Sequence, residues 1–306
     1  MTMASSAASS GTISARAALP GMAGQQMRSP WQLAWQRLRR NWAAMIGAAL
    51  SLLFIVVALL APVIRPYDPT QQNLGNALRS PGWPHVLGTD ELGRDLLSRI
   101  LMGARISLTI SVTSVAIAFC IGIVTGLISG FYGGVVDSVL MRCMDVLLAI
   151  PGILLAITVI AMLGVGLESL ILAIGVSSIP TFARIARGSA LALRSQEFVT
   201  AAVAIGATDR RLMQRHILPN ILAPLIVQTS LRLATAILTA SGLSFLGLGP
   251  QPPSAEWGAM LSTGRQYLTS APHVAIAPGV AIILVVFGFN LVGDGLRDAL
   301  DPRLRS

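Results

Sequence analysis

The feature that most constrains this chain is a series of apolar runs, each about as long as a lipid bilayer is thick. The first run, residues 43–64, reads AAMIGAALSLLFIVVALLAPVI and contains no charged residue. A helix needs about 20 apolar residues to cross the roughly 30 Å of hydrocarbon in a membrane. These runs predict an all-α membrane protein with six transmembrane helices, because five more follow at about residues 106–130, 144–164, 167–186, 217–240 and 273–293.

The composition excludes a soluble protein with a single core. Of the 306 residues, 54% are hydrophobic and only 11% are charged, whereas about a quarter of the residues in a soluble domain are charged. The net charge of +9 would also suit a nucleic-acid-binding protein. The arginines lie in short segments between the apolar runs, however, so the membrane interpretation is favoured.

Several chemical functions are excluded by residues that are absent or isolated. All 22 basic residues are arginines, and a phosphate-binding Walker loop ends in lysine, so this chain contains no P-loop. Two isolated cysteines and three widely spaced histidines give neither a disulfide framework nor a metal motif. No Ser/His, His/Glu or Asp/Asp combination lies at membrane depth, so we expect no catalytic residue, no metal and no enzyme activity.

The distribution of arginines predicts the orientation of the spans, because arginine-rich loops stay on the cytoplasmic side of a membrane. Six spans place three arginine-rich segments on that side: an N-terminal tail (1–42), the loop before the fifth run and a C-terminal tail (294–306). The segment 65–105 then lies outside and is expected to end in an interfacial helix. The segment 249–272 also lies outside, and five of the six spans form a core at residues 106–293.

Prolines and glycines inside the apolar runs predict local features of the spans. Pro151 and Pro180 are expected to kink the third and fourth spans, which neighbouring helices tolerate by supplying hydrogen bonds. Gly122, Gly126 and Gly130 lie four residues apart. This spacing is typical of a face on which two helices approach closely.

One hydrophilic segment interrupts the apolar pattern between the fourth and fifth runs. It reads EFVTAAVAIGATDRRLMQRHILPN from Glu197 to Asn220. The residues predict two short helices that are separated at Gly206, with Thr208 or Asp209 as the N-cap of the second helix. A solvated connector that carries positive charge at the inner membrane surface is an alternative interpretation.

This segment resembles the EAA coupling loop of ABC-importer permeases in the spacing of five residues: Ala201, Ala202, Gly206, Leu218 and Pro219. Further stretches are similar, in the right order, to the C-type permease subunit of peptide importers: LGTDELGRDLLSRILMGARISL (87–108), MRCMDVLLAIPGILLAI (141–157), RHILPN (215–220), LSFLGLGPQPPSAEWGAML (243–261) and FNLVGDGLRDALDPRL (289–304). That family imports dipeptides, oligopeptides, glutathione, nickel complexes and opines.

The resemblance covers nearly the whole chain from about residue 30 and implies a type I ABC-importer permease fold. It implies a heterodimer with a homologous permease, two cytoplasmic ATPases that bind ATP and Mg, and an extracytoplasmic binding protein that delivers the substrate. The chain itself is expected to hold no cofactor. The expected function is import of small peptides across the bacterial inner membrane, with both termini in the cytoplasm. A nickel-complex or opine importer is the alternative, followed by a secondary transporter.

The resemblance assigns coupling to the ATPases to residues 196–216 and the turn that follows. The expected coupling residues are Glu197, Ala201, Ala202, Gly206, Arg210, Arg211, Leu212, Met213, Arg215, Leu218 and Pro219. Leu212 and Met213 are expected to fill an apolar slot on an ATPase, while the arginines reach anionic lipid or acids of the ATPase. Thr200 stands where a glutamate is usual and Val203 where a basic residue is frequent, so Glu197 is expected to take part of the electrostatic role.

Two further groups of residues are candidates for function. Arg232 and Asp145 are candidates for the translocation path, because a charge at the centre of a span costs about 2.5–3.5 kcal/mol and faces protein or water. A partner acid for Arg232 and a helix-end contact for Asp145 are the alternatives. The Gly- and Pro-rich segment around Pro252, Glu256 and Trp257 is expected to meet the binding protein, with a rigid connector as the alternative.

Overall fold

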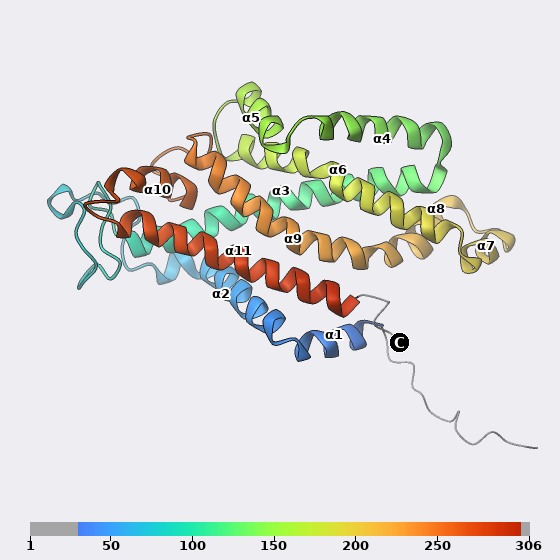
Figure 1. Cartoon of the computed structure of the whole chain (residues 1–306), viewed down its shortest axis with the longest axis horizontal. Helices are drawn as coiled ribbons and strands as arrows, with labels where there is room; N and C mark the ends of the chain where they lie inside the picture. Colours follow the sequence, from blue (N-terminus) through green and yellow to red (C-terminus); the bar gives the residue numbers. More distant parts are fainter. Residues whose placement is uncertain (1–29, 301–306) are drawn as a thin grey trace, which may run out of the picture.

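The computed structural model describes residues 30–300, with side chains from residue 35 onward, and consists there of helices and loops. Figure 1 shows an elongated bundle whose long helices follow roughly one axis. The predicted all-α fold is confirmed, because five helical segments are long and apolar enough to cross a membrane: Trp42–Ile64 (α2), Leu96–Tyr132 (α3), Leu167–Arg194 (α6), Asp209–Phe245 (α8 to α9) and His273–Leu300 (α11).

Several short elements lie toward the two ends of the bundle, while α4 and α5 lie along one side of it beside α6 (Figure 1). Figure 1 shows α1, α7, α8 and the last turns of α11 toward one end, and α10 with the loop after α2 toward the other. The elements not yet given, including the three parts of the segment Asp209–Phe245, have these bounds: Pro30–Arg40 (α1), Leu74–Asn76 (a 3-10 turn), Gly134–Ala149 (α4), Gly152–Leu163 (α5), Glu197–Ala204 (α7), Asp209–Arg211 (α8), Leu212–Ile217 (a π-helical turn), Leu218–Phe245 (α9), Trp257–Gly264 (α10) and Arg265–Tyr267 (a 3-10 turn).

The third apolar run does not form one straight helix. It is divided between α4 and α5, which are bent by 92° relative to each other, so the chain has up to six spans if this pair counts as one. Ile150 has an extended backbone with a ψ of 128°, because the ring of the following Pro151 disfavours the helical conformation. The kink predicted at Pro151 is thus a break between two helices, whereas α6 continues through Pro180.

Two predicted segment boundaries differ from the helix bounds in the structure. Residues 96–105 are the first turns of α3 rather than a separate interfacial helix. The helix begins there because the carboxylate of Asp95 accepts a hydrogen bond from the backbone N–H of Ser98 at 2.8 Å and caps the first turn. At the other end of the chain, α11 continues through residue 294 to Leu300, so the expected tail begins as helix. The expected N-terminal tail forms α1 in its described part, and its first 29 residues lie outside the described residues.

Buried ion pairs hold the loop between α2 and α3 against the start of α3. The carboxylate of Asp90 accepts a hydrogen bond from Nε of Arg94 at 2.6 Å, and Nε of Arg99 lies 3.2 Å from the same carboxylate. Arg94 also donates to Glu91 at 2.7 Å. Buried charges are stable only when they are paired in this way, so the loop has a defined structure on α3.

The core of the bundle is the contact between α3 and α6. The predicted close approach is present: a β-carbon on Gly122 would lie 2.5 Å from that of Phe182, and one on Gly126 would lie 2.7 Å from that of Ala186. Gly130 meets the backbone of Arg187 in the same way. The two helices therefore touch through their backbones over several turns.

Gly126→Val should destabilise the protein, because the new side chain would occupy space that Ala183 and Ala186 already fill. Overpacking of this kind costs about 1–3 kcal/mol. The melting temperature of the purified complex measures the effect. Gly188→Ala in α6 is the matched control, because a β-carbon there meets no atom within 4 Å. An unchanged melting temperature for Gly126→Val would contradict the observed approach of α3 and α6.

Candidate functional site

The hydrophilic segment after α6 folds as a short helix followed by a tight turn. α7 ends at Ala204, and Gly206 in the turn that follows has a φ of +81°. The N–H of Gly206 donates to the carbonyl of Val203 at 2.9 Å, and the N–H of Ala207 donates to the carbonyl of Ala202 at 3.0 Å. This pair of bonds caps a helix only when the residue at the turn adopts a left-handed conformation, which glycine does at little cost. The helix break predicted at Gly206 is present.

The second helix of this segment is continuous with the membrane span, so the predicted separate short helix is wrong. Helical structure continues from Asp209 through α8, the π-helical turn and α9 to Phe245. Thr208 stands at the N-cap position, but its side chain makes no capping hydrogen bond. The segment that was expected to be a free second helix is therefore the first part of the fifth span.

The π-helical turn before α9 has a local cause. Pro219 has no N–H to donate to the carbonyl of Arg215, and its ring would collide with that carbonyl in a regular α-helix. The N–H of Leu218 instead reaches back to the carbonyl of Met213. The chain thus accommodates the proline by widening one turn, and π turns of this kind are frequent at functional sites.

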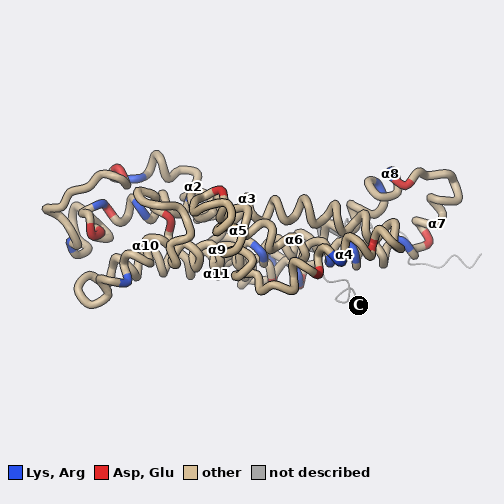
Figure 2. The backbone as a smooth tube through the Cα atoms, turned by 90° about the horizontal axis from the view of Figure 1, so that it is seen from above, with Lys and Arg blue, Asp and Glu red and all other residues tan. Residues whose placement is uncertain are grey.

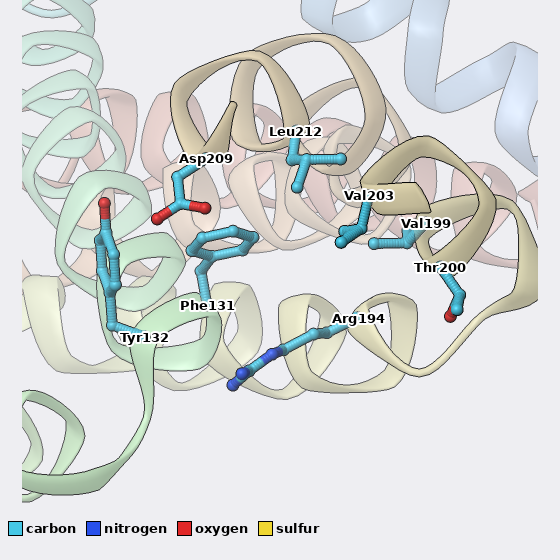
Figure 3. A pocket seen from close by; sticks show the side chains of 8 residues that line it. All are labelled: Phe131, Tyr132, Arg194, Val199, Thr200, Val203, Asp209 and Leu212. Carbon is cyan, nitrogen blue, oxygen red and sulfur yellow. The ribbon is translucent and has the colours of Figure 1, made fainter. Parts of the chain in front are cut away.

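A cavity of 310 Å³ lies between this segment and the ends of α3 and α6. Figure 3 shows its lining side chains, of which Thr200 points away from the others. Arg194, at the end of α6, lies with its guanidinium carbon 6.0 Å from the ring centre of Phe131. The lining residues are Phe131 and Tyr132 of α3, Arg194 of α6, Val199, Thr200 and Val203 of α7, and Asp209 and Leu212 of the following helix.

The apolar residues of the segment divide into a buried and an exposed set. Leu212 is only 2% exposed and packs in the core of this chain, so the expectation that it fills a slot on a partner is wrong. Phe198, Val203 and Ile205 are 44%, 55% and 87% exposed. We call these three residues the α7 patch. The sequence reasoning missed them, although Phe198 and Ile205, seven residues apart, have the spacing of one helical face.

The other predicted coupling residues also divide between the core and the surface. Ala202 lies in α7 and is buried. Met213 and Leu218 are half-buried against the core. The remaining residues are exposed: Glu197, Ala201, Gly206, Arg210, Arg211, Arg215 and Pro219. Within residues 35–300 no ion pair joins these arginines to an acid.

The two candidates for the translocation path are not brought together. Arg232 lies at the middle of α9 and is half-buried, and its Nη2 donates to the hydroxyl of Thr181 in α6 at 2.5 Å. Asp145 in α4 is exposed and accepts a hydrogen bond from Arg184 at 2.7 Å. The carboxylate of Asp145 therefore neutralises Arg184 and not Arg232.

The residues expected to dock a binding protein are mostly inside the fold. Glu256 and Trp257 are both 0% exposed, so their expected docking role is wrong. The Glu256 carboxylate accepts a hydrogen bond from the backbone N–H of Ala259 at 2.9 Å and caps α10, while burial raises the pKa of this carboxyl. Nε1 of Trp257 donates to the carbonyl of Ile100 in α3 at 3.1 Å. Pro252 alone among the three is exposed.

The described residues contain no group of three His, Cys, Asp or Glu side chains that could hold a metal ion.

Characterised proteins resemble this chain over almost its full length. It is 48% identical over 289 residues to the glutathione transport system permease protein GsiD of Escherichia coli O6:K15:H31 (strain 536 / UPEC), and the match covers 94% of this chain and 95% of that protein. The protein of the same name from Shigella boydii serotype 4 (strain Sb227) matches with the same identity and coverage. These relatives are transport permeases.

The fold is also found in solved structures. An inward-facing structure of the MetNI methionine ABC transporter matches with a TM-score of 0.54 and 20% identity, over 67% of this chain and 98% of that chain. A second crystal form of the same transporter gives a TM-score of 0.53 and 21% identity, over 66% of this chain and 96% of that chain. The expected ABC-importer permease fold is therefore confirmed.

Two family profiles match different parts of the chain. Residues 29–81 match the N-terminal TM domain of oligopeptide transport permease C. Residues 122–306, more than half of the chain, match the binding-protein-dependent transport system inner membrane component. Members of this family work with an ATPase and a substrate-binding protein. The chain is thus a multi-pass membrane protein and belongs to the family of inner membrane components of binding-protein-dependent transport systems.

Proposed function

We propose that this chain is the transmembrane subunit of an ATP-driven importer of small peptides, with glutathione as the first substrate to test. It forms one half of the translocation path, and a homologous permease forms the other half. The proposal is supported by the glutathione transport of relatives that are 48% identical and by the match to oligopeptide transport permease C. An importer of nickel complexes or opines is the alternative, and uptake assays with these substrates distinguish the two.

The observation that carries the proposal is the α7 patch. Its three apolar side chains are exposed at the end of the bundle, next to arginines of the following helix that form no ion pair within residues 35–300. An exposed apolar surface with a charged rim is typical of a docking site for another protein. The partner that fits is an ATPase, because this chain lacks the lysine that a P-loop requires. Two ATPase subunits then bind ATP and Mg, and this chain binds neither and performs no chemistry.

Helical continuity explains how such a contact does mechanical work. Force applied at α7 passes the turn at Gly206 and enters a helix that runs from Asp209 to Phe245 without interruption. A flexible linker at this position would dissipate the movement. The continuous helix instead transmits it to the middle of the fifth span.

The orientation follows from the ends of the bundle. α7, α1 and the last turns of α11 lie toward one end, as Figure 1 shows. Figure 2 shows charged residues gathered toward both ends, near α10 and near α4, α7 and α8. We place the α7 end in the cytoplasm of a bacterium, both termini with it, and the end with α10 and Pro252 beneath the binding protein.

Cysteine labelling tests this orientation. In a variant with Cys120→Ala and Cys143→Ala, a cysteine at exposed Ser80 should react with a membrane-impermeant maleimide in intact cells. A cysteine at exposed Ser195 should react only after the membrane is permeabilised. Labelling of residue 195 in intact cells would overturn the orientation.

Ile205→Asp should impair coupling without disturbing the fold, because the Ile205 side chain is 87% exposed in this chain. Loss of an apolar anchor at the centre of a protein interface costs about 2 kcal/mol or more. We therefore expect at least about a tenfold decrease in ATP-dependent glutathione uptake, with normal insertion of the permease pair into the membrane. Reconstituted uptake, and ATPase activity with and without loaded binding protein, are the measurements.

Two further variants sharpen the coupling test. Ile205→Leu is the matched control and should retain uptake, because it keeps the apolar surface. Gly206→Val should also uncouple, because a β-branched residue is strained at a φ of +81°. Normal uptake and normal ATPase stimulation in both Ile205→Asp and Gly206→Val would refute the assignment of this loop to coupling.

A further inference from the structure

One face of α9 is polar although the helix crosses the membrane. Gln228, Arg232, Thr235 and Thr239 follow one another at steps of four, three and four residues, so they share one side of the helix. All four reach the surface of this chain, as half-buried or exposed residues. The face is therefore available to something other than this chain.

A second polar face on α6 adjoins the first. Ser177, Thr181 and Arg184 are spaced by four and three residues and are also half-buried or exposed. The hydrogen bond between Arg232 and Thr181 joins the two faces at the midpoints of α9 and α6. We call the seven residues the polar strip.

The polar strip carries one positive charge that nothing in the described chain neutralises. Arg184 is paired with Asp145, but Arg232 has no ion pair within residues 35–300. Its Nε is buried without a hydrogen-bond partner. Thr181 accepts from Nη2, which satisfies only part of a guanidinium that has five N–H groups.

Lipid is excluded as the environment of this strip. An unpaired guanidinium at the centre of a span is costly in hydrocarbon and is found facing protein or water. Between residues 276 and 287 the exposed residues of α11 differ in kind, because all five are apolar: Ile276, Val280, Ile283, Leu284 and Phe287. The surface of the chain thus has an apolar side that suits lipid and a polar side that does not.

We propose that the polar strip lines the aqueous translocation path and that Arg232 binds a carboxylate of the passing substrate. This inference rests on the proposed import function and assigns a substrate class to the path. Hydroxyls suit a wet surface, because those of Thr235 and Thr239 donate to their own helix at 3.0 and 2.9 Å and keep their lone pairs for water. A guanidinium matches a carboxylate in shape and charge, and peptides carry a free carboxylate.

The first test measures whether the strip faces water and whether Arg232 sets its potential. In the complete transporter without native cysteines in this chain, Thr235→Cys is treated with a cationic and an anionic methanethiosulfonate reagent. We expect both to react, and the ratio of anionic to cationic rates to fall at least about fivefold when Arg232→Gln is added. Ile283→Cys, whose parent side chain is 66% exposed on the apolar side, is the matched control and should react with neither.

Two outcomes of this labelling overturn the proposal. If the Thr235→Cys variant reacts with neither reagent, the strip is sealed against the partner permease. If the variant reacts but its rate ratio is unchanged by Arg232→Gln, an acid of the partner already neutralises Arg232.

The second test measures uptake of labelled glutathione by the reconstituted transporter. Arg232→Gln should lower uptake at least about tenfold while loaded binding protein still stimulates the ATPase, and Arg232→Lys should restore most of the uptake. Uptake within twofold of wild type in Arg232→Gln, or loss of the partner permease on purification, overturns the carboxylate site. If the wild-type transporter shows no ATP-dependent uptake of any peptide, the proposed function is refuted instead. The labelling experiment still decides, independently of uptake, whether the polar strip is exposed to water.

Discussion

Direct backbone contact between α3 and α6 is the interaction on which the rest of the structure depends. The glycines of α3 remove the side chains that would separate the two helices. α3 then extends to both ends of the molecule. At one end Arg99 pairs with Asp90 of the loop between α2 and α3, and the carbonyl of Ile100 accepts a hydrogen bond from Trp257, whereas at the other end Phe131 lines the cavity beneath α7. A displacement of α3 along α6 would therefore change the contacts at both ends of the molecule.

Some of this architecture could be predicted from sequence because its causes are local. Apolar length alone decides which segments suit a bilayer, and the spacing of Gly122, Gly126 and Gly130 specifies one close-packing face. Gly206 likewise predicts a turn, because the positive φ at this position depends on the residue itself and not on its neighbours in the fold. The 92° between α4 and α5 has a different origin. Pro151 allows a break there, but the neighbouring helices set its size and direction.

The candidate sites were harder to predict because burial is a property of the whole fold. Glu256 and Trp257 stand in a Gly- and Pro-rich segment that looks like a surface loop, yet the absence of a side chain at Gly103 leaves room for the indole against α3. Leu212 and Ile205 are apolar residues of the same segment. Only their positions relative to the ends of α3 and α6 make the first buried and the second exposed.

The π-helical turn before Pro219 fixes the rotational phase between the two ends of one helix. Each residue of an α-helix advances the chain by about 100° around the axis, and the wide turn absorbs one extra residue. The side of the helix that meets the cavity under α7 is thereby set relative to the side that carries Arg232. An insertion or deletion of one residue in this turn would change none of the side chains on either surface. It would, however, rotate the surface that faces the cavity by about 100° around the helix axis relative to the surface that carries Arg232.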